Sequence, residues 1–384
     1  MRLLKAAAVA AGVALLSAGL LSAAPASAST GWTIQKIPRP GFGMFLPSVS
    51  CVTGGTCTAV GLYKIKSAGV VEGEPFAARR VSGGAWTEQA VPLPAGSTGG
   101  GVGAVSCTTA SFCMAVGGAD HGPRAWTWDG TNWSLVPVPA PGSDPGLDWV
   151  SCWSATACMA VGQYSPTPGG PSTDLVETWD GTSWAVQPAG TGTTGELSEV
   201  SCSSASFCMA IGLGTSLGWI SESWNGSTWT VHAVPVPPGA TRGIALFGVS
   251  CASATACTTV GDATVNAPIP TSSVLAERWN GTAWKVQSIP APSGDSLLNG
   301  VSCATTTSWT AVGYNNSPAP VAESWNSASG WTLQTAATPG RATFSHLSGV
   351  SCLSATTCTA TGFYNIVQGG TSGIPLAEHE QGRR

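Results

Sequence analysis

The stretch VSCWSATACMAVGQY, residues 150–164, decides the fold because close copies of it recur along the chain. Its tripeptide Val-Ser-Cys occurs seven times, and the cysteines follow one another at intervals of 56, 45, 50, 49, 52 and 49 residues. That spacing is typical of one four-stranded propeller blade. We therefore expect an all-β chain that folds as a seven-bladed β-propeller with four-stranded blades. The seven cysteines are Cys51, Cys107, Cys152, Cys202, Cys251, Cys303 and Cys352.

One complete unit shows the four predicted strands. The first ends at residues 150–152, and the second covers residues 158–164 after a short turn. The third is LVETW, residues 175–179, and the fourth is WAVQ, residues 184–187. Between the last two, Asp180-Gly181 is expected to supply the pair of positive φ angles of a tight hairpin. Pro-rich segments then lead to the next unit.

The two ends of the chain complete each other. The last unit stops after its third strand, at Leu376-Ala377-Glu378, and never produces a fourth. The missing piece stands near the other end as Gly31-Trp32-Thr33-Ile34-Gln35, which matches the pattern of residues 183–187. We expect the last blade to be closed by this N-terminal strand, which leaves no free sheet edge between the first and last blades. An open solenoid would need capping repeats, and we identify none in the sequence.

The cysteines form a second regular pattern. In six units another cysteine stands six positions after the first, and in the sixth unit Trp309 takes its place. Cysteines that flank a short hairpin turn are cross-strand neighbours and oxidise in an exported protein. A metal site would need four ligands converging on one ion, so neither a metal nor a cofactor is expected. Cys303 is left over, either buried in an inner strand or available as a reactive thiol. The predicted second partners are Cys57, Cys113, Cys158, Cys208, Cys257 and Cys358.

The first 28 residues have the properties of an export signal. Arg2 and Lys5 precede an apolar run, and Ala26-Ser27-Ala28 matches a signal peptidase site. We expect a signal peptide over residues 1–28, one propeller domain over residues 29–384, and a monomeric protein secreted to the extracellular space, free of the membrane after cleavage. An uncleaved membrane anchor is the alternative. Without Arg2 and Lys5, 13 basic residues face 19 acidic ones, and this negative balance argues against a nucleic-acid partner.

The repeat resembles a group of secreted bacterial propeller proteins. Its consensus runs from Val-Ser-Cys to Leu-x-Glu-x-Trp-(Asp/Asn)-Gly-Thr-x-Trp-x-Val-Gln and covers nearly the whole chain after the signal. It is more distantly similar to the kelch/galactose-oxidase propellers and to the sialidase-type Asp-box propellers. Residues 178–184 (TWDGTSW) look like an Asp-box that is one residue short, and in that family the box is structural. A copper site of the galactose-oxidase kind is not supported, since it would need a Tyr-Cys crosslink.

Residues that recur in every unit are explained by blade construction, whereas a binding site is needed once. A glutamate occupies the same third-strand position in five units, and we expect each to be a buried carboxylate that accepts hydrogen bonds from backbone or Ser. The tryptophan pairs, such as Trp179 with Trp184, are expected to pack between blades. The five glutamates are Glu177, Glu222, Glu277, Glu323 and Glu378.

Blade topology separates two faces of the ring. The disulfide hairpins and the Asp/Asn-Gly turns fall on one, which we call the hairpin face. The loops between second and third strands and the blade-to-blade connections fall on the other, the loop face. Loops of unequal length on a rigid scaffold are where recognition usually resides. Four tyrosines stand at the mouths of these loops and are predicted ligand-binding residues, although a repeat that merely keeps Tyr at a strand end is the alternative. They are Tyr63, Tyr164, Tyr314 and Tyr364.

Two functions remain open. The first is a non-catalytic extracellular module that binds a glycan or a protein on the loop face. The second is a carbohydrate-active enzyme, sialidase- or lyase-like, that uses Asp120, His121 and Arg124 of one short loop, with Arg242 and Arg341 as further cations. Convergent acids, His and Arg around the axis would favour the enzyme, whereas scattered Tyr and small polar residues would favour binding. The sequence favours the binding module.

Overall fold

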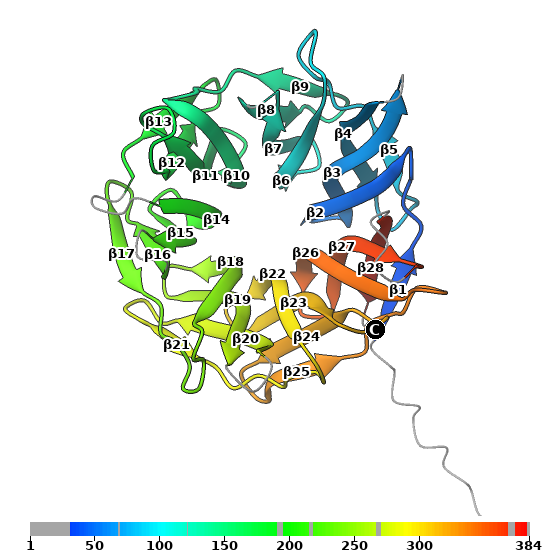
Figure 1. Ribbon diagram of the computed structural model, residues 1–384, viewed down its shortest axis with the longest axis vertical. Coiled ribbons are helices and arrows are strands. Elements are labelled where there is room, and N and C mark those ends of the chain that lie inside the picture. Colours follow the sequence, from blue (N-terminus) through cyan, green and yellow to red (C-terminus); the bar gives the residue numbers. More distant parts are fainter. Residues whose placement is uncertain are drawn as a thin grey trace, which may run out of the picture.

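A ring of seven blades surrounds a central axis (Figure 1). The computed structural model describes residues 31–67, 70–120, 122–189, 195–214, 218–265, 270–367 and 373–381. In these residues all regular structure is β, in seven four-stranded antiparallel sheets, and no helix is present. The expected seven-bladed propeller is confirmed. The predicted signal peptide, residues 1–28, lies outside the described residues and stays a prediction.

Blades are numbered from the first complete one, and each runs from an inner to an outer strand. Blade 1 contains β2 (Phe42–Val52), β3 (Thr56–Ser67), β4 (Val70–Arg80) and β5 (Thr87–Gln89). Blade 2 contains β6 (Gly100–Thr109), β7 (Phe112–Ala119), β8 (Gly122–Trp128) and β9 (Trp133–Val136). Blade 3 contains β10 (Ser143–Ser154), β11 (Ala157–Ser165), β12 (Thr173–Trp179) and β13 (Trp184–Gln187).

The remaining blades follow the same order. Blade 4 contains β14 (Gly195–Ser204), β15 (Phe207–Gly214), β16 (Trp219–Trp224) and β17 (Trp229–Ala233). Blade 5 contains β18 (Ile244–Ser253), β19 (Ala256–Val265), β20 (Thr271–Trp279) and β21 (Trp284–Val286). Blade 6 contains β22 (Ser296–Thr305), β23 (Ser308–Asn315), β24 (Val321–Asn326) and β25 (Gly330–Gln334). Blade 7 contains β26 (Phe344–Ser354), β27 (Thr357–Asn365), β28 (Ile374–Gln381) and the N-terminal β1 (Trp32–Gln35).

The N-terminal strand closes the ring as the sequence predicted. β1 pairs antiparallel with β28, and the register places Ile34 opposite Glu378 and Gln35 opposite Ala377. Trp32 is buried in the cluster that also contains Leu347 and Leu376. The sheet of blade 7 therefore contains both the first and the last strand of the propeller, and this closes the ring (Figure 1).

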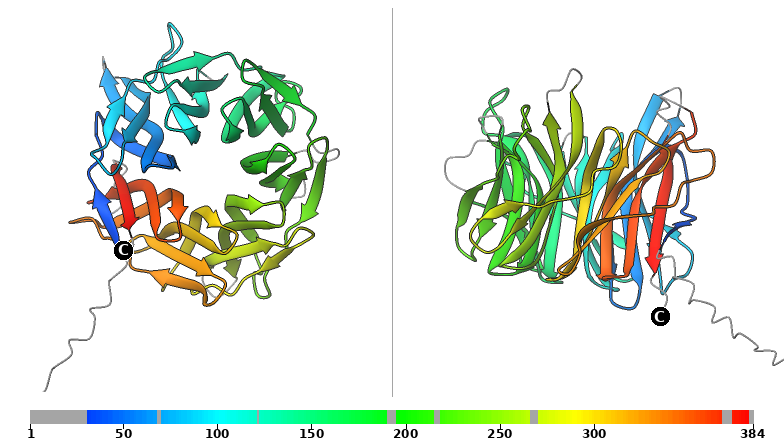
Figure 2. Two further views of the ribbon diagram at one scale, coloured as in Figure 1. Left: turned by 180° about the vertical axis from the view of Figure 1, so that it is seen from behind. Right: turned by 90° about the horizontal axis from the view of Figure 1, so that it is seen from below.

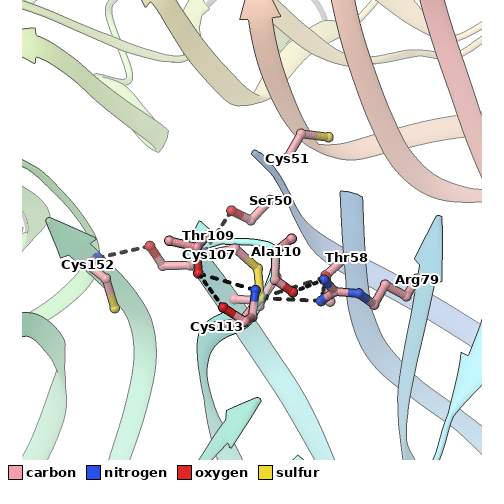
Figure 3. Close-up of a disulfide and its surroundings, with 12 residues drawn as sticks. Ser50, Cys51, Thr58, Arg79, Cys107, Thr109, Ala110, Cys113 and Cys152 are labelled. Atoms are coloured by element: carbon pink, nitrogen blue, oxygen red, sulfur yellow. Dashed lines mark hydrogen bonds between the residues drawn. A yellow bond between two sulfur atoms is a disulfide. The ribbon is translucent and has the colours of Figure 1, made fainter. Parts of the chain in front are cut away.

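The serine of each Val-Ser-Cys tripeptide explains why the tripeptide recurs. In every blade its Oγ accepts a hydrogen bond from the backbone N–H of the cysteine in the next blade, at 2.9–3.0 Å. Figure 3 shows two of these contacts, at Cys107 and Cys152. The seventh bond, from Cys51 N–H to Ser351 Oγ at 2.9 Å, joins the first blade to the last. The seven serines thus form an unbroken belt around the axis.

Each second strand contains a glycine that the inner strand makes necessary. The inner strand of six blades shifts register beside this glycine, as it does between Leu147 and Trp149. A Cβ on the glycine would lie 1.8–2.2 Å from a backbone oxygen of the inner strand in all seven blades, far closer than any real contact. No residue with a side chain fits this position, so the repeated Gly follows from close backbone approach. The glycines are Gly61, Gly117, Gly162, Gly212, Gly261, Gly313 and Gly362.

The six predicted disulfides are present, each joining the two cysteines of one unit. Cys152 and Cys158, for example, are directly paired across the first hairpin of blade 3. Bonds of this kind stabilise by roughly 2 kcal/mol each when they close so short a loop. They are Cys51–Cys57, Cys107–Cys113, Cys152–Cys158, Cys202–Cys208, Cys251–Cys257 and Cys352–Cys358.

The turn after the third strand differs from the expected one. Trp179 pairs with Trp184 and the rings lie 5.8 Å apart, so four residues separate the strands. Only Gly181 has a positive φ, of 98°, and Asp180 does not share it. Instead, Asp180 Oδ1 accepts hydrogen bonds from the backbone N–H groups of Thr182 and Ser183. The prediction of two positive φ angles is wrong, because the Asp side chain builds the turn through these bonds.

The repeated glutamates are fully buried, but their expected partners are mostly missing. Glu378 Oε2 accepts a hydrogen bond from Ala337 N–H at 3.1 Å. Neither carboxyl oxygen of Glu177, Glu277 or Glu323 has a hydrogen-bond partner among the described residues. For these three the prediction of accepted hydrogen bonds is wrong.

Proline explains the missing partners. Ala337 stands six residues after the first tryptophan of its outer strand, and the same count in the connections before blades 3, 5 and 6 gives Pro139, Pro235 and Pro290. Proline has no N–H to donate. Burial raises the pKa of Glu177, Glu277 and Glu323 to about 8, so that these acids are protonated at neutral pH. In Glu378 burial raises the pKa to about 7, and the bond from Ala337 opposes the rise.

Candidate functional site

The two faces of the ring are built differently. All strands run between them, and longer loops project from one side while compact turns close the other (Figure 2). The disulfide hairpins and the Asp/Asn-Gly turns lie together on the compact hairpin face. The loop face carries segments that vary from blade to blade, such as the long β3–β4 hairpin of blade 1 and the short β7–β8 connection of blade 2.

The loop face contains a cleft at the inner ends of blades 1, 2 and 3. It has a volume of about 720 Å³, and we call it the axial cleft. Inner strands β2, β6 and β10 form its walls, together with the ends of β3 and β7. Its lining residues are Phe45, Pro47, Leu62, Gly99–Gly103, Gly117–Asp120, Gly122 and Asp144–Trp149.

Glycines form most of the wall contributed by blade 2. The run Gly99-Gly100-Gly101-Val102-Gly103 occupies positions where the other inner strands have side chains such as Phe45 in blade 1. A Cβ on Gly99, Gly100 or Gly101 would come within 2.8–3.0 Å of neighbouring atoms of Gly73, Leu93 or Leu62. The blade 2 side of the cleft is therefore lined mainly by glycine and other small residues.

Three aspartates contribute the charge of the axial cleft. Asp120 and Asp144 have positive φ angles of 47° and 52°, a conformation that side chains other than Asp and Asn rarely tolerate. Asp148 lies where β10 shifts register, between Leu147 and Trp149. Desolvation, reinforced by the nearby charge of Glu196, raises the pKa of Asp148 to about 6.

The predicted catalytic cluster does not assemble among the described residues. Asp120 Oδ1 accepts hydrogen bonds from both the backbone N–H and the hydroxyl of Thr98, and bonds from Ser97 and Thr98 lower its pKa to about 2. An acid so readily ionised is a poor proton donor or base near neutral pH. Arg124 does not line the cleft, and its Nη1 donates to the carbonyl of Pro123 at 2.8 Å. His121 lies outside the described residues.

An aromatic cluster continues the rim of the axial opening from blade 1 to blades 7 and 6. The ring of Phe45 packs edge-on against Phe363 at 6.0 Å, and His346 lies 5.0 Å from Phe363 and 4.7 Å from Tyr314. Burial lowers the pKa of His346 to about 4, so that its neutral Nε2 accepts the bond from Asn299 Nδ2 at 2.6 Å. Because Phe45 belongs to both features, the cluster and the axial cleft form one surface.

The four predicted tyrosines are divided by the structure. Tyr63, Tyr164 and Tyr364 are half-buried, and each packs against the apolar cluster beside its own blade. Tyr314 belongs to the aromatic cluster, with Phe344 5.3 Å away. None of the four lines the axial cleft. Their role as ligand contacts therefore stays a prediction, and Tyr314 is the member nearest to this surface.

Cys303 lies in the inner strand of blade 6. This is the first of the two alternatives that the sequence left open for it. Its Sγ donates to the carbonyl of Ser250 at 3.1 Å, and burial raises its pKa to about 12. The thiol is therefore protonated at neutral pH, which argues against a reactive role. Trp309 pairs with Cys303 in the position of the absent cysteine and is 1% exposed.

Some features bear on compartment and cofactors. In the part of the chain that the structure describes, no three His, Cys, Asp or Glu side chains gather in a way that could hold a metal ion. The same part contains no helix of the length and hydrophobicity that crossing a membrane requires. Six disulfides are typical of proteins from an oxidising, extracellular environment.

No family model and no curated protein matches the sequence. Solved structures share the fold. YCF48 from Cyanidioschyzon merolae has a TM-score of 0.56 at 13% identity over 91% of this chain and 98% of that chain, and YCF48 bound to D1 peptide gives the same values with 95% of that chain. A GH74 xyloglucanase from Xanthomonas campestris has a TM-score of 0.55 at 12% identity over 87% of this chain and 53% of that chain. A fucose-specific lectin from Aleuria aurantia has a TM-score of 0.47 at 12% identity over 75% of this chain and 93% of that chain. At these identities the likeness shows the fold alone.

Proposed function

We propose that this protein is a secreted, non-catalytic binding propeller that holds a glycan in the axial cleft. The observation that carries the proposal is the cleft itself, about 720 Å³ in volume and lined by residues that interrupt the repeat. The serines, glycines and disulfides that recur around the ring are explained by blade construction, whereas this cleft occurs, among the described residues, at one place only. Clefts of this size on a rigid scaffold are the usual place for a small ligand.

The lining of the cleft suits a sugar. The carboxylates of Asp120, Asp144 and Asp148 accept hydrogen bonds from hydroxyl groups, and the small residues Gly99–Gly101 line the cleft beside them. The rings of Phe45 and Trp149 supply apolar faces at the same site. This combination of polar groups and aromatic faces matches the two kinds of surface that a sugar ring presents.

A protein ligand is the competing outcome within the same class of function. Among the structures that share the fold, YCF48 is bound to D1 peptide, which shows that a propeller of this kind can bind a peptide. The fold alone does not choose between glycan and peptide. We favour the glycan because three aspartates and two aromatic rings line the same cleft, whereas peptide recognition commonly uses an extended groove or sheet edge.

Binding to a glycan array and to insoluble polysaccharides, measured with the mature protein, tests the proposal. Gly146 lines the cleft and has no atom within 4 Å of an added Cβ, so Gly146→Trp is designed to place a bulky ring in the cleft. Gly340 lies in the connection before blade 7 and also has open space, which makes Gly340→Trp the matched control. Binding that is lost in the first variant and kept in the second supports the proposal; equal binding by both variants contradicts it.

A carbohydrate-active enzyme is the second candidate, and Asp148 is the observation that favours it. A carboxyl group with its pKa raised to about 6 beside a second acid has the properties of a general acid. Release of reducing sugar from polysaccharides that the protein binds would test this role. Turnover that disappears in Asp148→Asn while binding remains would identify an enzyme, whereas binding without any turnover supports the non-catalytic module.

A further inference from the structure

Blade 5 has a cation at each of two facing positions on its third and fourth strands. The other blades do not have a pair of cations at these positions. Arg278 of β20 lies directly opposite Lys285 of β21 in the antiparallel register. Like charges directly opposite each other destabilise a sheet. No aspartate or glutamate is among the residues that line the cavity beside them. The cavity therefore has two cations in its lining and no carboxylate beside them to neutralise their charge.

The equivalent pairs in other blades explain what blade construction requires here. In blade 6 the pair is Ser324 and Thr332, whose hydroxyls lie 3.2 Å apart. In blade 3 it is Thr178 and Ala185, and Gln187 donates to the threonine hydroxyl. Small hydroxyl residues thus satisfy the scaffold. The Arg–Lys pair of blade 5 is an unrepeated feature, as a binding site should be.

The guanidinium of Arg278 is fixed by blade 6. Its Cζ lies 4.3 Å from the ring centre of Trp309 and 4.1 Å from that of Trp325, and its Nη2 donates to the carbonyl of Thr306 at 3.3 Å. The tryptophan that replaces the missing cysteine therefore supplies part of the platform. A cation held in place this way loses little conformational entropy when it binds an anion.

Comparison with Arg79 in blade 1 shows which features of the Arg278 site are explained by packing between blades and which are not. It occupies the equivalent position, stacks over Trp128 at 4.8 Å and donates to the equivalent carbonyl of Ala110 (Figure 3). Its cross-strand partner, however, is Thr87, and Arg79 is only 8% exposed. Stacking on the next blade accounts for an arginine alone, but it does not account for a lysine placed beside a partly exposed arginine.

A cavity of about 370 Å³ on the hairpin face adjoins the two cations. Besides Arg278 and Lys285, its lining includes the polar side chains of Thr255, Asn280 and Gln287. Asn280 Oδ1 accepts three hydrogen bonds within its turn, which leaves the Nδ2 group as a donor. Two cations and several neutral donors form a lining that suits an oxyanion.

We propose that this cavity binds the sulfate or phosphate group of an extracellular polyanion, with Arg278 and Lys285 as its two charged contacts. Arg278 is the fixed contact, and Lys285 is the exposed, mobile one. The site lies on the hairpin face, apart from the axial cleft, so it stands or falls independently of the glycan proposed there. The whole chain has a net charge of −4, and its attraction to a polyanion therefore depends on a local site.

Affinity electrophoresis of the mature protein in gels containing heparin, polyphosphate or neutral dextran tests the proposal. We expect retardation by heparin or polyphosphate, absent with dextran and reversed by salt. The polymer that retards more identifies the source of the oxyanion. Lys285→Gln should weaken the apparent affinity about tenfold, as expected for loss of a charge-assisted contact. Lys36→Gln removes an equal charge from an exposed position elsewhere and should change nothing.

Arg278→Lys keeps the charge but loses the planar stack, and it should weaken binding as well; circular dichroism and the melting temperature report whether that variant remains folded. Lys285 is exposed, so the fold does not depend on it. No retardation by either polymer would overturn the proposal. Retardation of Lys285→Gln equal to that of the unaltered protein, or an equal loss in Lys36→Gln, would overturn it too.

Discussion

The repeated framework and the axial cleft show two different uses of one sequence pattern. The framework consists of the seven serine bonds, the seven second-strand glycines and the six disulfides, and it is nearly identical in every blade. The cleft lies where blades 2 and 3 depart from the pattern, through Gly99–Gly101, Asp144 and Asp148. The contrast teaches that the regular positions build the ring, and that the cleft proposed as the ligand site is formed where the pattern is interrupted.

The largest expected effect is a loss of framework stability at alkaline pH. Glu177, Glu277, Glu323 and Glu378 have pKa values raised by burial to about 7 or 8, against about 4.5 unfolded. The folded state therefore binds more protons, and stability is fully present below about pH 4.5 and lost as pH rises towards 8. Each acid contributes up to about 1.4 kcal/mol per pH unit within that range. The melting temperature should fall steadily from pH 5 to pH 8.

Glu277→Gln provides the control for this pH dependence. It should raise the melting temperature at pH 8 relative to the unaltered protein, and change it little at pH 5, because Gln imitates the protonated acid. A melting temperature that rises between pH 5 and pH 8 in the unaltered protein would contradict the prediction. It would show that ionisation of the buried glutamates does not destabilise the fold.

The next effect concerns glycines of the two regions. Gly261→Ala places a Cβ 1.8 Å from the carbonyl oxygen of Ala245, and we expect a loss of about 3 kcal/mol from the resulting backbone shift. Gly146→Ala, in the cleft, has no atom within 4 Å of the added Cβ and should be nearly neutral. Denaturant unfolding of both variants measures the difference. Similar losses of stability in the two variants would show that the framework glycine and the cleft glycine do not differ as predicted.

A smaller effect is expected in the serine belt. Ser351→Ala leaves the N–H of Cys51 without its acceptor and should cost about 1–2 kcal/mol. Ser201→Ala removes the equivalent bond to Cys251 within the ring and should cost the same. Chemical denaturation of the two variants compares them. A much larger cost for Ser351 would mean that the junction between first and last blades is the weak point of the framework.

The smallest effect is expected in the cleft itself. Asp148→Asn should raise the melting temperature slightly at pH 8 and leave it unchanged at pH 5, because the pKa of Asp148 is raised to about 6 and the ionised form is the costly one. Thermal denaturation at the two pH values checks this. A clear loss of stability at pH 8 would assign Asp148 to the framework.

Several features of the site were out of reach of the sequence. Asp148 follows no motif, and its pKa is raised by desolvation and, to a lesser extent, by Glu196, which belongs to another blade. The glycine run at residues 99–103 was visible, and its departure from the repeat is the signal that could have located the cleft. Asp120 was expected as a possible catalytic acid, and the structure places it in the lining of the axial cleft. Its bonds to Thr98 depend on how a blade-to-blade connection folds back.

The sequence by itself determined the number of blades, the closure by residues 31–35 and the six disulfides, because each depends on spacing along the chain. It also determined that the five repeated glutamates are buried, since they share one position of the third strand. Only the tertiary structure decided which groups meet across blades. Glu378 accepts a bond from Ala337 of a blade-to-blade connection, Trp309 supports Arg278, and Phe45 joins the aromatic cluster to the axial cleft. These contacts join different blades, and their geometry is fixed by the packing of the whole ring rather than by any local pattern.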